Sequence, residues 1–161
     1  MNFPDKLTVI VRDRQTGLPI GQVAVRMELF AAHKNNYSVG PSVTDEKGQV
    51  VFTRAACELA IKRAKEMFLM DYHSNLGECR PFVEVSLHLP ERVEGMIRQY
   101  KDAPHFWGLG FDDPERTIAV LQNVKNADYA SALVRASEHE IMSHPQLELL
   151  LSKKDGSSRG F

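Results

Sequence analysis

The sequence has few of the features that point directly to a class of protein. It contains two cysteines, Cys57 and Cys79, and one tryptophan in 161 residues. Two cysteines are too few for the disulfide framework of a small secreted domain, so we expect both to be reduced core thiols. No apolar run approaches the roughly 20 residues of a membrane span. Residues 1–6 are too few and too polar for a signal peptide. We therefore expect a cytoplasmic protein with no membrane partner.

The chain also lacks an excess of charge of either sign. Its 20 Lys and Arg residues face 21 Asp and Glu residues, for a net charge of −1. So close a balance creates no field that attracts nucleic acid, and we expect no nucleic-acid partner. The hydrophobic fraction of 43% is sufficient for a packed core without disulfides. The length corresponds to one domain, or to one domain with an appendage.

Alternating patterns in the first half of the chain predict β-strands. Apolar residues alternate with polar or mixed ones over residues 7–12, 23–30 and 81–89, as they do in half-buried strands. Residues 31–40 are mostly polar and are typical of an exposed loop or a short edge strand. Two β-prone runs joined by a turn that ends in Gly predict a hairpin over residues 43–52.

A helical period then replaces the alternation. Cys57, Ile61 and Ala64 follow one another at helical spacing and predict an amphipathic helix over residues 55–70. After a proline that ends the strand before it, apolar residues at helical spacing predict a short helix over residues 91–101.

The last third of the chain is predicted to be helical as well. Asp113 as an N-cap and Pro114 at the first position start a helix that continues over residues 117–124. Residues 117–122 could instead form a last strand. Periodic apolar residues predict a longer helix over residues 127–142.

The chain is expected to end in one more helix and a tail. Ser143 before Pro145 predicts the start of a short helix that runs to residue 151, and residues 153–161 are typical of a frayed tail.

A family resemblance appears in the first fifty residues. The runs Asp13-Arg-Gln-Thr-Gly17-Leu-Pro19, Val23-Ala-Val25 and Thr44-Asp-Glu-Lys-Gly48-Gln-Val50 resemble the opening of transthyretin-like (prealbumin-like) domains. Carboxypeptidase regulatory-like and Cna-B-type modules share this pattern. The resemblance implies an α+β chain built on an antiparallel transthyretin-like or Ig-like β-sandwich.

The domain organisation expected from this resemblance has three parts. Residues 1–90 would form the sandwich, with a crossover helix inserted at 55–70. Residues 91–152 would form a helical extension packed on the sandwich, and residues 153–161 a flexible tail.

One branch of the superfamily, the 5-hydroxyisourate hydrolases, allows a test for catalysis. The positions that match its catalytic histidine and arginine hold Ile10 and Gln49 here. Ile10 cannot accept a proton, and Gln49 carries no charge to stabilise a developing anion. Residues 158–161 echo the C-terminal Y-R-G-S motif of these enzymes only superficially. The resemblance therefore implies the sandwich without the hydrolase activity.

The loop of residues 102–113 has the most unusual composition in the chain. Its large apolar residues are Phe106, Trp107, Leu109 and Phe111. These side chains could fill the seam between sandwich and helices, or they could be exposed as an anchor for a protein partner. We predict the second role, in a non-catalytic binding or accessory module that is a subunit or adaptor of a larger, bacterial-type assembly. The edge at residues 31–40 could also pair with a second copy of the chain.

The alternative hypothesis is a small hydrolase. Its site would be assembled around His105 and Asp112, with His73 or Asp71 as further candidates.

Two apparent motifs do not support other functions. The run of residues 108–111 spells the carboxylate-binding loop of PDZ domains, but Asp112 and the aspartate after it would repel a carboxylate. His139 and His144 are five residues apart, whereas a zinc-binding helix needs histidines four apart on one face. We expect neither a metal nor a cofactor.

Overall fold

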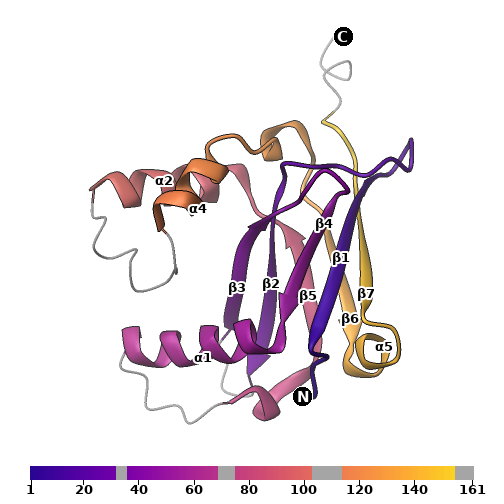
Figure 1. Cartoon of the computed structure of the whole chain (residues 1–161), viewed down its shortest axis with the longest axis vertical. Helices are drawn as coiled ribbons and strands as arrows, with labels where there is room; N and C mark the ends of the chain where they lie inside the picture. The colour runs from indigo at the N-terminus through magenta and orange to yellow at the C-terminus, as the bar shows by residue number, and fades with distance from the viewer. Residues whose placement is uncertain (32–35, 69–74, 103–113, 155–161) are drawn as a thin grey trace.

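Two β-sheets form the centre of the molecule, with helices at the sides and at one end (Figure 1). The computed structural model describes residues 1–31, 36–68, 75–102 and 114–154. One sheet has the strand order β4 (Gln49–Thr53), β1 (Lys6–Asp13), β7 (Gln146–Leu151). The other has the order β3 (Asn36–Val43), β2 (Ala24–Ala31), β5 (Cys79–Leu87), β6 (Leu133–Ser137). All neighbouring strands are antiparallel except β1 and β7, which are parallel.

The core lies between the two sheets. Val9 of β1, Met27 of β2 and Val85 of β5 are each fully buried, and they belong to one cluster that draws on both sheets. Over most of β2 and from Val83 onward in β5, buried residues alternate with less buried ones, as expected for strands with one face on the core, whereas β1 buries Val9, Ile10 and Val11 in succession. The strands predicted over residues 7–12, 23–30 and 81–89 are therefore confirmed.

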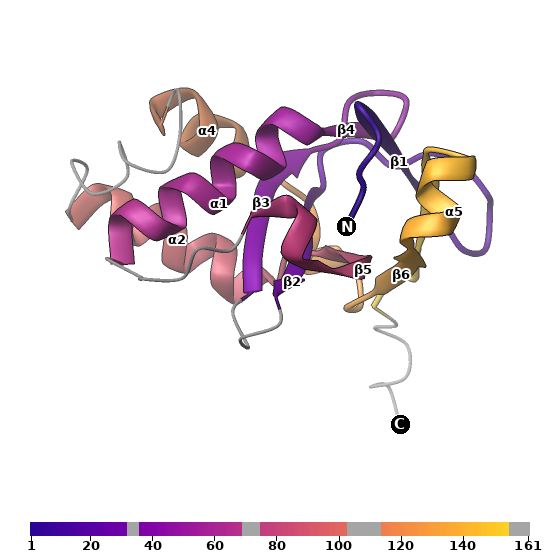
Figure 2. The same ribbon diagram turned by 90° about the horizontal axis from the view of Figure 1, so that it is seen from below.

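Helix α1 (Arg54–Phe68) begins directly after β4 and crosses beside β3 (Figure 2). The hydroxyl of Thr53 accepts a hydrogen bond from the N–H of Ala56 (3.0 Å), which satisfies one free donor of the first turn. Cys57 and Ile61 bury the inner face of the helix in the core. The amphipathic helix predicted here is confirmed.

Helices α2 (Pro90–Asp102) and α4 (Pro114–Leu121) pack together at one end of the four-stranded sheet. Val93 of α2 meets Ile118 and Leu121 of α4 in a small second cluster, to which the β2 residue Ala24 also belongs. The helix predicted over residues 91–101 is confirmed. Residues 117–121 are helical, so the alternative of a last strand there is wrong.

The hairpin predicted over residues 43–52 is wrong, although the turn inside it is real. The N–H of Gly48 donates to the carbonyl of Asp45 (2.9 Å), and the positive φ of Gly48 (72°) favours glycine. The two strands that the turn joins, however, lie in different sheets: β3 pairs with β2, and β4 pairs with β1. A turn signal shows that the chain reverses but not which strand it pairs with next.

The helices predicted over residues 127–142 and 143–151 are also wrong. Apart from the short helix α5 (Glu138–Ser143) and a 3-10 turn (Asn126–Asp128), these stretches supply β6 and β7. Val134 and Ala136 lie opposite Val85 and Val83 of β5, which would otherwise lack a partner on that side. Within the described part of residues 91–152, α-helix is therefore confined to α2, α4 and α5.

The structure shows an edge strand at residues 36–43 and an ordered segment directly after β7. Residues 36–43 form an edge strand rather than a loop, with Tyr37 and Val39 buried. Beyond β7, Lys153 pairs with Tyr129, and the N–H of Lys154 donates to the carbonyl of Asp128 (2.9 Å). The predicted tail therefore does not begin at residue 153.

Cys57 and Cys79 are free thiols, as expected. Burial raises the pKa of Cys57 to about 12, which keeps this thiol protonated and unreactive. Among the described helices, none has the length and apolar character needed to cross a membrane.

Candidate functional site

The outer face of the four-stranded sheet carries an unusual number of charged and aromatic side chains. Because β2 and β5 bury every second residue, the residues between these point away from the core. On these two strands and on β6 they include Arg26, Glu28, Phe30, Phe82, Glu84, Ser86, Leu133 and Arg135.

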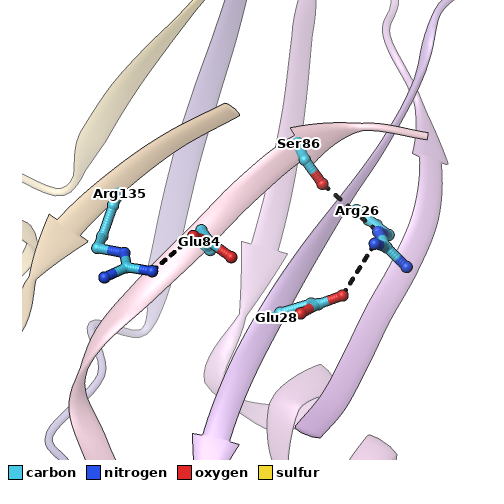
Figure 3. A network of polar contacts seen from close by, with 5 residues as sticks. All are labelled: Arg26, Glu28, Glu84, Ser86 and Arg135. Carbon is cyan, nitrogen blue, oxygen red and sulfur yellow. Dashed lines mark hydrogen bonds and ion pairs between the residues drawn. The ribbon is translucent and has the colours of Figure 1, made fainter. Parts of the chain in front are cut away.

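Each of the two glutamates on this face forms an ion pair with an arginine. Glu28 and Glu84 lie directly opposite each other on neighbouring strands, a pairing that like charges disfavour. The guanidinium of Arg26 lies 3.0 Å from Glu28, and its Nε–H donates to the hydroxyl of Ser86 (3.4 Å). Arg135 donates to Glu84 at 2.8 Å (Figure 3). The cluster is thus electrically balanced.

The side chains of Arg26 and Glu28 are only 18% and 17% exposed, although they lie on an outer face. A half-buried ion pair is held more firmly than a pair on an open surface, because solvent competes with it less. It gives this part of the face a fixed arrangement of charges.

Aromatic side chains continue the face toward the other end of the strands. The rings of Phe30 and Phe82 have centroids 5.1 Å apart at an interplanar angle of 32°. The guanidinium carbon of Arg135 lies 4.6 Å from the centroid of the Phe82 ring, within the range of a cation–π contact. Arg135 is therefore positioned by both a carboxylate and a ring.

A hollow of about 400 Å³ opens on this face, where β5 ends and the chain enters β6. Four polar side chains of β2 and β5 and several apolar ones contribute to its lining: Arg26, Glu28, Glu84, Ser86, Leu87, Leu89, Ala132 and Leu133. Leu133 is 62% exposed and Leu89 37% exposed, so the hollow has apolar residues open to solvent beside its charges. A side chain or small group that is partly apolar and partly charged matches this lining.

A buried polar joint supports the end of the sheet beside this face. The side chain of Asn126 accepts from the N–H of Ala24 (2.8 Å) and donates to the carbonyls of Ala24 (2.9 Å) and His88 (2.7 Å). The joint connects β2, the end of β5 and the segment that leads to β6. It fixes the position of the segment that borders the hollow.

His88 lies at this joint and is itself buried. Its Nε2 is 3.2 Å from the sulfur of Met96, and its Nδ1 has no hydrogen-bond partner among the residues that the structure describes. Burial, together with the positive charges of Arg26 and Arg92, lowers the pKa of His88 to about 4. The imidazole is therefore neutral at pH 7 and belongs to the packing of α2 on the sheet.

A smaller hollow of about 230 Å³ lies between β3 and α4, with Pro41, Val43 and Val120 in its lining. It has fewer polar groups than the hollow beside β6. We therefore place the candidate site on the outer face of the four-stranded sheet.

The residues predicted from the sequence to carry function lie outside the described residues. This applies to Phe106, Trp107, Leu109 and Phe111 of the aromatic loop and to His105, Asp112, Asp71 and His73 of the alternative hydrolase site. Both roles stay predictions.

Other positions weighed in the sequence can be placed. Ile10 and Gln49 face each other across β1 and β4, so the positions matched to the hydrolases' catalytic residues do meet in space but carry inert side chains. His139 and His144 are exposed at α5. No three His, Cys, Asp or Glu side chains gather as metal ligands within the described part of the chain.

Sequence reasoning missed the outer face of the sheet as a site. The alternation placed Arg26 and Glu28 on one side of β2, and Glu84 and Ser86 on one side of β5. It gave no register between these strands, and the helix predicted over residues 127–142 concealed Arg135. The signal that could have been used is the repeated occurrence of charged residues on the outward positions of strands that are otherwise apolar.

Comparisons with protein-family models, with curated proteins and with solved structures find no match for this chain.

Proposed function

We propose that this chain is a non-catalytic protein-binding or accessory module built on a transthyretin-like β-sandwich. The motif resemblance over residues 13–50 supports this class of fold. The two mostly antiparallel sheets, with α1 between β4 and β5 in the chain, are compatible with it.

The observation that carries the binding role is the hollow beside β6. It combines a half-buried ion pair, a serine hydroxyl and exposed leucines in one place. Exposed apolar residues bordered by polar groups are characteristic of protein interaction sites. Leu133 would contribute apolar contact area, and the Arg26–Glu28 pair would orient polar groups of the partner.

The side chains at the hydrolase positions support binding rather than catalysis. Ile10 and Gln49, which face each other in the three-stranded sheet, provide neither a general base nor a positive charge. The role we propose does not depend on them.

The experiment compares two leucine variants of the full chain. Leu133 and Leu18 are almost equally exposed, at 62% and 64%, but Leu18 lies in the turn after β1, away from the hollow. Leu133→Asp should reduce the recovery of a partner captured from the source cell at least about tenfold, as for a central interface residue. Leu18→Asp should leave the recovery unchanged.

Two results would contradict the proposal. One is a wild-type chain that captures no partner in stoichiometric amount. The other is a partner that both variants retain equally, with circular dichroism showing that both are folded.

A further inference from the structure

Strand β6 ends the four-stranded sheet on the side of the hollow. β7 lies next to it in Figure 1 and contacts it, and the N–H of Ala130 just before β6 donates to the carbonyl of Ser152 just after β7 (2.9 Å). β7 itself belongs to the other sheet, where it pairs with β1. The residues that lead into β6, from Ser131 to Leu133, form part of the lining of the hollow. The part of the edge formed by residues 133–137, which pair only with β5 among the described strands, is therefore continuous with the hollow.

The hydrogen-bond pattern shows which backbone groups of β6 are directed outward. The N–H of Leu87 donates to the carbonyl of Ala132 (3.0 Å). Because alternate residues bond in an antiparallel ladder, Val134 also bonds toward β5, and the backbone groups of Leu133 and Arg135 are directed away from it. Within the described part of the chain, β5 is the only strand that pairs with β6. Unpaired strand edges of this kind accept a further strand.

The side chains of Leu133 and Arg135 indicate which residues a strand added at this edge would contain. Leu133 is 62% exposed, and the side chain of Arg135 is 58% exposed. Arg135 bonds Glu84 through Nη2 and lies over the Phe82 ring, while its Nε and Nη1 have no hydrogen-bond partner among the described residues. An arginine with free donors favours a carboxylate across the ladder, and an exposed leucine favours an apolar residue.

We propose that the β6 edge binds an extended segment of a partner protein as an additional antiparallel strand. An acidic residue of that segment lies opposite Arg135, and an apolar residue two positions further on lies opposite Leu133, beside the hollow. The inference rests on the protein-binding role proposed above and specifies the chemistry of the partner.

A second copy of the chain fits this edge less well. Strand β6 has the sequence Leu133-Val-Arg-Ala-Ser137 and contains no acidic residue. Antiparallel pairing of β6 with its own copy would place Arg135 opposite a leucine, a serine or another arginine, depending on the register. None of these satisfies its free donors, so charge complementarity favours a different chain.

The probes for the test are two fluorescein-labelled ten-residue peptides, rich in threonine and valine. One has a glutamate followed two positions later by a leucine, and in the other a lysine replaces the glutamate. In fluorescence polarisation with the full chain, the glutamate peptide should bind about fivefold more tightly, which is the upper range for one cross-strand pair.

Three variants separate the contributions of charge and backbone. Arg135→Ser should abolish the preference for the glutamate peptide. Arg135→Pro removes an outward N–H without removing a bond to β5, and it should weaken binding at least about tenfold. Arg14→Ser, at an exposed arginine in the turn after β1, is the matched control and should change neither result.

Several outcomes would overturn the inference. These are no binding of the glutamate peptide, equal affinity for both peptides, or unchanged binding by a folded Arg135→Pro variant. A concentration-dependent dimer that Arg135→Pro dissociates would also overturn it, because a second copy would then occupy the edge. If Leu133→Asp still abolishes capture of the cellular partner in any of these cases, the binding role stands and only strand addition fails.

Discussion

Asn126 is the single residue on which the junction between the sheet and the last third of the chain depends most. It is 1% exposed, and its amide satisfies the N–H of Ala24 and two backbone carbonyls. Asn126→Ala would leave the buried N–H of Ala24 without a partner. We expect it to lower the free energy of unfolding by roughly 2–4 kcal/mol in urea titrations, from lost hydrogen bonds and an unsatisfied donor.

Asn123→Ala is the matched control for this prediction. Asn123 is exposed, and among the described residues its side chain bonds only the carbonyl of Ala119, at 3.2 Å. Its removal should cost less than about 0.5 kcal/mol. Equal losses in the two variants would show that the Asn126 network does not hold the junction.

His88 predicts a pH dependence at the same junction. Its pKa is lowered to about 4 from 6.5, so the folded chain disfavours the protonated imidazole. The stability that this provides is fully present above pH 6.5 and is lost as the pH falls toward 4, by up to about 3 kcal/mol.

Comparing the wild type with His88→Leu isolates this contribution, because carboxylates titrate in both. The free energy of unfolding of the variant should fall less between pH 7 and pH 4.5, by at least about 1 kcal/mol. Parallel pH profiles for the two proteins would exclude His88 as the cause.

At the scale of elements, β6 and β7 complete the two sheets from the end of the chain. Leu149 and Leu151 of β7 and Ile141 of α5 are fully buried. The sequence analysis instead confined the sandwich to residues 1–90, with helices following it. In the structure, both sheets thus depend on residues that lie well beyond residue 90 in the sequence.

Truncation tests this dependence. A chain that ends at residue 131 lacks β6, α5 and β7, which exposes one edge of β1 and one edge of β5 together with the core between them. We expect no cooperative thermal unfolding transition for this chain by circular dichroism, whereas a chain that ends at residue 154 should retain it. A cooperative transition in the shorter chain would contradict the structure and favour a sandwich within residues 1–90.

Whether a strand or helix can be predicted from the sequence depends on its length and on the strands with which it pairs. Residues 23–30 and 81–89 alternate over enough positions to exclude a helix, and the long face of α1 excludes a strand. Residues 133–137 are only five, and Leu133 and Ala136 fit a helical period as well as Val134 and Ala136 fit an extended one. Pairing with β5 and β1 decides between helix and strand for the last third of the chain. The local pattern of apolar residues does not predict pairing between strands that lie so far apart in the sequence.

At the scale of the molecule, the candidate site depends on the assembly of the sheet. Arg26, Glu84 and Arg135 come from three strands, and each is an ordinary surface charge in its own segment. Only the registers of β2, β5 and β6 bring them together beside the hollow. The aromatic loop is conspicuous in the sequence, whereas this surface can be recognised only in the folded chain.

The central claim is that the outer face beside β6 is where this chain binds another protein. Amide hydrogen exchange of the full chain, with and without the partner retained by the wild type and lost by Leu133→Asp, tests it most directly. We predict slower exchange at Leu133 and Arg135, whose N–H groups are directed outward, and no change in the turn around Leu18. Slower exchange confined to α1 or to the three-stranded sheet, with β6 unchanged, would contradict the claim.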